Sequence, residues 1–417
     1  MFPKKALPVV LVAGALLLSV QGGPIGSWFA ISSPLSGGDH LGASIAYNSQ
    51  RQEYLVVFWN VDTNWVWGQR VARNGTLVGA PITITGDSNG HAPDVAYNSQ
   101  HDEYLVVWKH IDATSWSIKA RRVAANGSLP GGVVTVASGS IADTYGTGPT
   151  VAYASTADRY LVIYEYGNYY GWQQYGIAAR AFTSDGSPEG PAFDVRPYGG
   201  GAPTLGFDLA YNRARNEFLV VWSGVTGTTY AILGRRVKMA GGAGTVGDIF
   251  TTADTPTDDI YPAVAALPFP AGVGQYLVAW QYVYSPSDND IYAQRVAGDG
   301  SGPVGAPIII SNPVVDQRAP AVDGSETGQR YLVAWSHDSA PPFLFVGIRA
   351  RAVSMGGDLL GQEEGVGGVF AYHAAVAAGP VGDFLVAYDD APLGAIYRGI
   401  YGRLWGNRIY LPLVQRQ

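Results

Sequence analysis

One six-residue phrase recurs seven times along the chain and constrains the fold more than any other feature. The copies are EYLVVF (53–58), EYLVVW (103–108), RYLVIY (159–164), EFLVVW (217–222), QYLVAW (275–280), RYLVAW (330–335) and DFLVAY (383–388). An arginine follows each copy in a second strand-like run, at Arg70, Arg122, Arg180, Arg236, Arg295, Arg351 and Arg403. Repeats of this length are typical of one array of stacked units. We therefore expect a single repeat domain rather than several domains.

Each unit predicts four short strands. The first is small and apolar, as in DVAYN (94–98), and the second is the repeated phrase. The third carries the arginine, as in IKARRVA (118–124), and the fourth resembles PITIT (81–85). Asn-Gly or Asp-Gly pairs separate the third and fourth strands in several units, and such pairs accept the positive φ of tight hairpin turns. Neighbouring strands should therefore be antiparallel.

The second strand of each unit is apolar on both faces. In the second copy, Tyr104, Val106 and Trp108 point to one face and Leu105 and Val107 to the other, because strand side chains alternate. Sheets stacked face to face around an axis would cover both faces. Crowding near the axis would favour the alanines of the first strands, Ala46, Ala96, Ala152, Ala210 and Ala265. The prediction is an all-β fold, a seven-bladed β-propeller of four-stranded antiparallel blades over residues 24–405.

The repeat phase also predicts how the ring closes. The segment SWFAIS (27–32) resembles a fourth strand without a blade, whereas the seventh unit has no obvious fourth strand. We expect this N-terminal strand to complete the last blade by pairing with the third strand near residues 396–404. The alternative is RIYLPLV (408–414), within the C-terminal tail 406–417. Either strand would cover an exposed sheet edge.

The N-terminal segment MFPKKALPVVLVAGALLLSVQGG has two lysines followed by an uncharged run over residues 6–20. This pattern predicts a signal peptide over residues 1–22, and hence a secreted or cell-surface protein. The chain has no cysteine, so it should fold without disulfides. Its net charge is −7, and no Lys/Arg cluster follows the N-terminus, which argues against nucleic acid as a partner. We expect a monomer with no membrane span in the mature chain.

The repeats resemble the EYLVVW…DIYAQRV…DG units of secreted bacterial propeller-like proteins that are largely uncharacterised. Residues 290–300, DIYAQRVAGDG, carry the closest match, and the resemblance covers about residues 27–405. It implies the repeat type and carries no catalytic motif. The ending IYLPLVQRQ is similar to a tail found on some secreted bacterial proteins.

The seven arginines could form an anion-binding ring, but their presence in every unit favours a structural role. Small residues such as Gly68 and Ala120, two positions earlier, leave room for a guanidinium to lie against an aromatic ring or a carboxylate. We therefore expect Arg122 and Arg236 to be mostly buried beside such a partner.

Function is expected where the units differ, in the loops before each first strand and after each second strand, which share one face. The candidate ligand-binding residues there are His40, Trp65, His91, Asp94, Trp116, Tyr170, Trp172, Asp259, Tyr284 and His373. Acids would lie near the axis and aromatic residues further out. Aromatic planes beside carboxylates suit sugar rings, so the face favours a neutral or cationic polar ligand such as a glycan.

Three of these candidates, His40, His91 and His373, precede the first strands of consecutive units and could cluster. The chain has no HxH or HExxH spacing, so no metal and no cofactor is predicted. A P-loop and the sialidase Asp-box are also missing from the sequence, and no catalytic residue is predicted.

Taken together, these patterns predict a non-enzymatic recognition or cell-surface propeller that binds a glycan or a protein. The alternative is an extracellular carbohydrate-active enzyme, a hydrolase or lyase, with carboxylates contributed by several blades. A structural envelope component without a small ligand is the third hypothesis.

Overall fold

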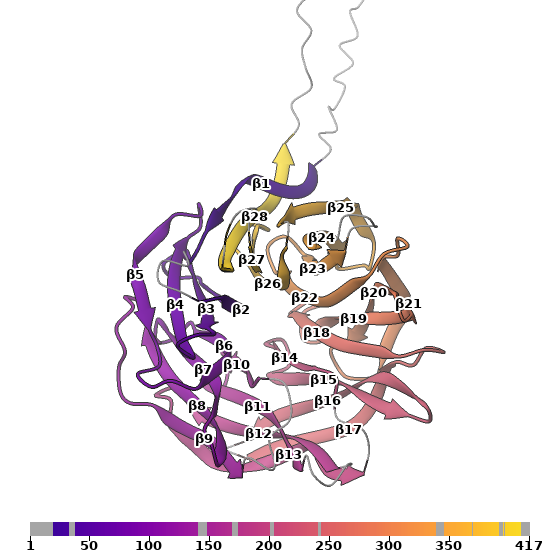
Figure 1. The fold of residues 1–417 in the computed structure, drawn as a ribbon. Coiled ribbons are helices and arrows are strands. Elements are labelled where there is room, and N and C mark those ends of the chain that lie inside the picture. The colour runs from indigo at the N-terminus through magenta and orange to yellow at the C-terminus, as the bar shows by residue number, and fades with distance from the viewer. Residues whose placement is uncertain are drawn as a thin grey trace, which may run out of the picture.

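The computed structural model describes residues 20–32, 38–140, 148–168, 174–200, 204–240, 243–338, 346–368, 370–391, 395 and 397–409. These residues form 28 strands and no helix, and therefore no helix that could cross a membrane. The strands make seven four-stranded antiparallel sheets, arranged as blades around a central axis (Figure 1). The predicted seven-bladed β-propeller is confirmed.

Within each blade the strands follow one another from the axis outwards. Blade 1 consists of β2 (His40–Asn48), β3 (Glu53–Asn60), β4 (Trp65–Ala72) and β5 (Leu77–Thr83). Blade 2 consists of β6 (Gly90–Asn98), β7 (Glu103–Ile111), β8 (Ser115–Ala124) and β9 (Val134–Ser140). Blade 3 consists of β10 (Thr150–Ala154), β11 (Arg159–Asn168), β12 (Gln174–Thr183) and β13 (Pro188–Gly200). Blade 4 consists of β14 (Phe207–Asn212), β15 (Glu217–Thr226), β16 (Thr229–Ala240) and β17 (Ala243–Ala253).

The last three blades follow the same order, except that the outermost strand of blade 7 comes from the N-terminus. Blade 5 consists of β18 (Asp259–Leu267), β19 (Gln275–Ser285), β20 (Asp288–Ala297) and β21 (Pro303–Ser311). Blade 6 consists of β22 (Gln317–Ser325), β23 (Arg330–Asp338), β24 (Val346–Ser354) and β25 (Leu359–Gly367). Blade 7 consists of β26 (Tyr372–Ala378), β27 (Phe384–Asp390), β28 (Gly399–Ile409) and β1 (Val20–Ala30).

The ring is closed by β1, which pairs with β28 in antiparallel register, Phe29 opposite Gly402 and Ala30 opposite Tyr401. The predicted N-terminal closure is confirmed. The strand is longer than the predicted 27–32, because Val20–Ala30 includes the last residues of the predicted signal segment. Its partner runs to Ile409, beyond the predicted boundary at 405. Most of the alternative closing segment, residues 410–414, lies outside the described residues.

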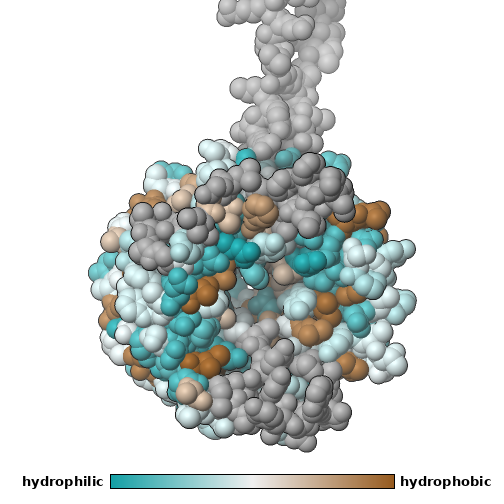
Figure 2. All heavy atoms as spheres, viewed as in Figure 1, coloured by the Kyte–Doolittle hydropathy of each residue, from teal (hydrophilic) through white to brown (hydrophobic). Residues whose placement is uncertain are grey.

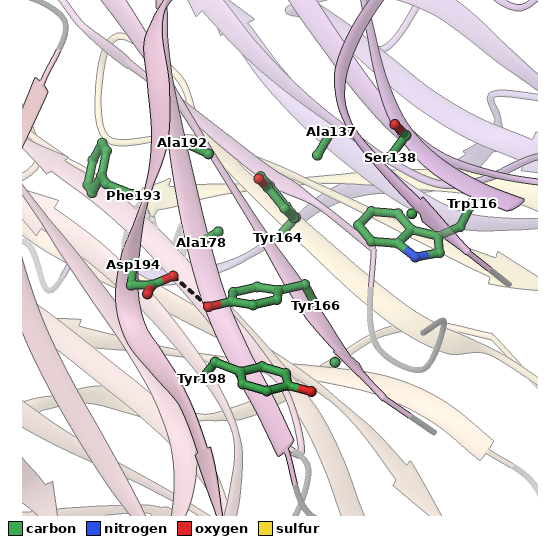
Figure 3. Close-up of a pocket in the computed structure, with 12 residues that line it drawn as sticks. Trp116, Ala137, Ser138, Tyr164, Tyr166, Ala178, Ala192, Phe193, Asp194 and Tyr198 are labelled. Carbon is green, nitrogen blue, oxygen red and sulfur yellow. Dashed lines mark hydrogen bonds between the residues drawn. The ribbon is translucent and has the colours of Figure 1, made fainter. Parts of the chain in front are cut away.

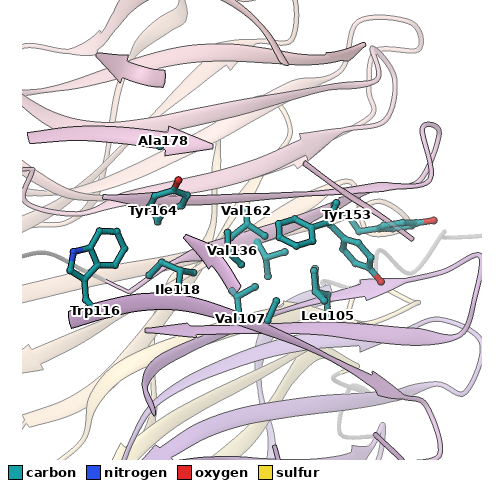
Figure 4. Close-up of a cluster of buried hydrophobic side chains, with 14 residues drawn as sticks. Leu105, Val107, Trp116, Ile118, Val136, Tyr153, Val162, Tyr164 and Ala178 are labelled. Atoms are coloured by element: carbon teal, nitrogen blue, oxygen red, sulfur yellow. The ribbon is translucent and has the colours of Figure 1, made fainter. Parts of the chain in front are cut away.

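The hydrophobic core is divided into clusters between neighbouring blades, and Figure 4 shows the cluster between blades 2 and 3. Leu105 and Val107 of β7 belong to that cluster, whereas Tyr104, Val106 and Trp108 of the same strand pack against blade 1. Both faces of the strand are therefore buried, as the alternation predicted. Each fully buried large side chain contributes about 1.5–3 kcal/mol to stability, so the blades hold one another in place.

The inner strands contact one another around the axis, and three aspartates connect them. Their carboxylates each accept a hydrogen bond of 2.8 Å from a backbone N–H in the next blade, in the pairs Asp94–Val151, Asp208–Val264 and Asp323–Ala378. Burial raises the pKa of Asp208 to about 7, and the charges of Asp94 and Asp323 add to this effect. These acids are part of the scaffold.

The repeated arginines are also structural, but they fall on two faces of the third strands. Arg122 and Arg236 are partly buried and form ion pairs with Glu103 and Glu217, so the expected acidic partners are present. Arg122 pairs with the third residue of the repeated phrase, whereas the fourth residue of the phrase pairs with Arg180, Arg351 and Arg403 in their blades. Because strand side chains alternate, this shift of one residue places the three arginines on the opposite face. They donate to carbonyl oxygens of the preceding blade, those of Val136, Ile310 and Val366. The repeated arginines therefore form ion pairs within a blade or contacts between blades, and not one ring.

Candidate functional site

The loops after the second strands and the loops before the first strands meet on one face of the ring, called here the loop face. Backbone hydrogen bonds connect the two sets of loops, from Val61 to Asp39 (2.9 Å) and from Gly90 to Asn64 (2.7 Å). Figure 2 shows one face of the ring, hollowed at its centre, with hydrophilic side chains around the hollow.

The three candidate histidines have separate partners. His40 Nδ1 lies 2.8 Å from Ser32 Oγ, and the His91 ring packs edge-on against Trp59 at 4.9 Å. Burial lowers the pKa of both of these histidines. His373 Nδ1 lies 3.0 Å from Asp389 Oδ1, and this hydrogen bond raises its pKa. Within the described part of the chain, no group of three His, Asp or Glu residues is placed to hold a metal ion.

The candidate acids bind protein groups rather than open solvent. Asp94 accepts hydrogen bonds from Ser44 and from the inner strand of blade 3. Asp259 is fully buried and accepts a 2.7 Å hydrogen bond from the Trp280 indole. Burial raises the pKa of Asp259 to about 6. Both carboxylates are therefore held by protein groups within the blades.

The candidate aromatic residues are dispersed. Trp65 packs near Trp67, with ring centroids 5.9 Å apart. Tyr284 is largely exposed at the end of β19 and lines none of the pockets described below. Trp116 is buried and lines a groove. Tyr170 and Trp172 lie outside the described residues.

The groove that contains Trp116 lies between blades 2 and 3 on the loop face and has a volume of about 470 Å³. We call it the outer groove. Its walls come from the ends of β8 and β9 on one side and of β11 and β13 on the other (Figure 3). Its main side chains are Trp116, Tyr164, Tyr166, Phe193, Asp194 and Tyr198.

Two tyrosines form a stacked pair in the outer groove. The rings of Tyr166 and Tyr198 are 5.7 Å apart and nearly parallel, at 12°. The Tyr166 hydroxyl donates a 2.5 Å hydrogen bond to Asp194 Oδ1 (Figure 3). Burial, together with that carboxylate, raises the pKa of Tyr166. Gly176 makes room for the pair, because an added Cβ there would lie 2.6 Å from the Tyr166 ring.

Trp116 forms part of the wall of the same groove. Its side chain is only 5% exposed, and its indole Nε1 has no hydrogen-bond partner among the described residues. Gly139 lies directly over this nitrogen, since a Cβ built there would be 2.6 Å from it. The indole nitrogen is therefore enclosed by the protein, and Trp116 contributes its ring to the groove.

A second hollow lies closer to the axis, between blades 5, 6 and 7, and has a volume of about 650 Å³. We call it the axial pocket. Inner-strand β-bulges shape it, with Tyr261, Ala319 and His373 at positive φ (51°, 48° and 49°). Bulges redirect side chains at strand ends. The bulge in β26 brings His373 into the pocket.

Of the residues that sequence reasoning proposed, Trp116 lines the outer groove and His373 lines the axial pocket, whereas most of the other lining residues were not candidates. Tyr198 and Asp194 belong to a fourth strand, outside the loops in which candidates were sought. Arg318, Asn289 and Asp338 line the axial pocket and were not candidates. The available signal for the bulges was proline inside a first strand, at Pro93, Pro262 and Pro320, since proline in a strand marks an edge or a bulge.

No known family model matches the chain, and no curated protein matches it. Solved structures share its fold. A protein of unknown function from Dyadobacter fermentans is 12% identical, with a TM-score of 0.51, over 94% of this chain and 100% of that one. An α-L-arabinanase from Penicillium chrysogenum, complexed with arabinobiose, is 12% identical, with a TM-score of 0.50, over 91% and 97%. At this identity the likeness concerns the fold alone.

Proposed function

We propose that this chain is a secreted, non-enzymatic propeller that binds a glycan in the outer groove. The observation that carries the proposal is the stacked pair of Tyr166 and Tyr198 beside the Asp194 carboxylate. The N-terminal segment with its two lysines and uncharged run supports secretion.

Sugar rings combine apolar C–H faces with hydroxyl edges, and the outer groove offers a partner for each. The Tyr198 ring, 44% exposed, can stack on a sugar face while Tyr166 supports it from behind. Asp194, which is exposed, can accept a hydrogen bond from a hydroxyl, and the Trp116 ring adds to the aromatic wall. A mostly aromatic lining with a few fixed polar groups is typical of ligand sites.

The groove favours binding over hydrolysis. Glycoside hydrolysis needs two carboxyl groups about 5–10 Å apart. Among the described residues that line the groove, Asp194 is the only acid, and it already holds the Tyr166 hydroxyl. The Penicillium arabinanase carries a saccharide on a similar fold, which makes saccharides a reasonable first class of ligand to test.

A glycan array with the mature protein, followed by calorimetric titration of the best ligand, tests the proposal. Tyr198→Ala should weaken binding at least about tenfold, equivalent to about 1.4 kcal/mol, because it removes the stacking ring. Tyr284→Ala is the matched control, an exposed tyrosine outside the groove, and should leave affinity unchanged. Unchanged binding by Tyr198→Ala would refute the assignment. Shortened products after prolonged incubation with the ligand would favour the hydrolase instead.

A further inference from the structure

The axial pocket differs from the outer groove in its chemistry, because charged and amide side chains line it. It is built from the starts of the inner strands β18, β22 and β26 together with the loop-face ends of β19, β20 and β23. Its principal polar residues are Gln281, Asn289, Arg318, Ser336, Asp338 and His373. Tyr261 and Tyr372 add aromatic surface.

Two of the acids associated with this pocket, Asp316 and Asp389, lie behind its basic side chains, whereas Asp338 lines the pocket itself. Asp389 is fully buried, and His373 covers one of its oxygens while the Arg398 guanidinium lies 3.6 Å from the other. The buried Asp316 carboxylate is similarly covered by Arg318. The side chains of His373 and Arg318 are 61% and 51% exposed. A ligand entering the pocket would therefore meet Arg318 and His373, with Asp338 beside Arg318.

The orientation of these cations is fixed by the protein. Arg318 also approaches Asp338, at 3.5 Å, and the Arg398 guanidinium stacks on the Tyr372 ring at 4.6 Å. Because ion pairs and the bulged backbone hold the groups in place, little side-chain entropy remains to be lost when a ligand binds. This is a preorganised surface.

Deeper in the pocket, Asn289 provides an acceptor that lacks a donor. Its side chain is 8% exposed, and its Nδ2 donates to Asp316 Oδ1, which orients the amide. The opposite atom, Oδ1, has no hydrogen-bond partner among the described residues. An unsatisfied buried acceptor is costly. A ligand hydroxyl is the simplest group that would satisfy it.

We propose that the axial pocket binds an acidic sugar residue, a ring that carries both hydroxyls and one carboxylate. The carboxylate lies against Arg318 and His373, and a hydroxyl donates to Asn289 Oδ1. A guanidinium presents a fork of donors that suits a carboxylate. The partly exposed Asp338 disfavours ligands with a denser negative charge, such as phosphate. This site is separate from the outer groove and does not depend on it.

The inference reverses the sequence-based expectation of a neutral or cationic ligand near the axis. That expectation placed Asp94 and Asp259 at the mouth, where both would face a ligand. In the structure both carboxylates are engaged by other protein groups, and arginines that were not candidates line or adjoin the pocket instead.

Calorimetric titration with trigalacturonate, its methyl ester and a neutral oligosaccharide of the same length tests the proposal. We expect the acid form to bind at least about tenfold more tightly than the ester. Arg318→Lys keeps the charge but loses the fork, and should weaken binding of the acid about tenfold. His373→Asn should also weaken it, and asparagine tolerates the positive φ at this position better than most residues. Thermal melting establishes that each variant is folded.

Tyr198→Ala is the control that separates the two sites. It should leave binding of trigalacturonate unchanged, and Arg318→Lys should leave binding in the outer groove unchanged. Three outcomes would overturn the proposal: no binding of trigalacturonate, equal affinity for acid and ester, or binding that is lost with Tyr198→Ala but kept in both axial variants. The first two outcomes do not bear on whether the outer groove binds a neutral glycan, and the third would place trigalacturonate in the outer groove.

Discussion

Ile31 connects the closing strand to the core, and its truncation should weaken ring closure. It directly follows β1, is only 2% exposed, and packs in a cluster formed by blades 1 and 7 that includes Tyr54, Phe58 and Ile400. Its N–H also donates a 2.8 Å hydrogen bond to the Ile400 carbonyl. Truncation of a buried Ile to Ala typically costs about 2–5 kcal/mol, through lost burial and the cavity left behind. We expect Ile31→Ala to lower the free energy of unfolding by about 3 kcal/mol.

Urea titration followed by tryptophan fluorescence measures this change, with Ile25→Ala as the matched control. Ile25 is the same residue type in the same closing segment, but it is 41% exposed. Its truncation should cost less than about 1 kcal/mol, as for most surface substitutions. Equal losses in the two variants, or a loss below about 1 kcal/mol for Ile31→Ala, would show that the N-terminal clasp does not stabilise the ring.

Three further predictions concern the scaffold and the outer groove. Because burial raises the pKa of Asp208 to about 7, the folded state holds its proton more tightly than the unfolded state. Stability should therefore fall as pH rises from about 4 to about 7. Plotted against pH over this range, the urea midpoint should fall less steeply in Asp208→Asn than in the unmutated protein. Identical slopes in the two proteins would contradict the assignment. Trp280→Phe removes a donor from the buried Asp259 carboxylate and should cost about 1–3 kcal/mol in thermal or urea unfolding, whereas a neutral result would mean that this contact is dispensable. Gly176→Ala should displace Tyr166 and abolish glycan binding in the outer groove, and retained affinity in a titration would argue against the stacked pair as the binding element.

Much of the fold followed from local patterns because the repeat is a local signal. The phrase around Tyr104 alternates two apolar faces, which predicts a sheet covered on both sides, and seven copies predict seven blades. The unmatched strand before His40 predicted the N-terminal clasp by the phase of the repeat alone. Its length was underestimated, since the pairing partner Ile409 lies in a segment that was assigned to the tail.

The assignment of side chains to faces was less predictable. The repeated arginines look equivalent in sequence, but a shift of one residue turns Arg180 to the face opposite that of Arg122. Alternation makes any strand sensitive to such a shift. Adjacent arginines, such as Arg121 and Arg122, point to opposite faces of their strand. Arg121 donates a hydrogen bond to the Ile84 carbonyl of the preceding blade.

What the sequence by itself determined is the number of blades, their order and the face on which the loops gather, because these depend on periodicity and on antiparallel connection. Which loop-face residues form a site was decided by tertiary structure. Asp94 and Asp259 form hydrogen bonds within the scaffold. Tyr198 lines the outer groove because it lies near the end of the long strand β13, and Arg318 lines the axial pocket because it lies at the bulge of the inner strand β22. The outer groove joins residues from two blades, and the axial pocket joins three. Contacts between blades depend on the packing of distant segments, which no local pattern encodes.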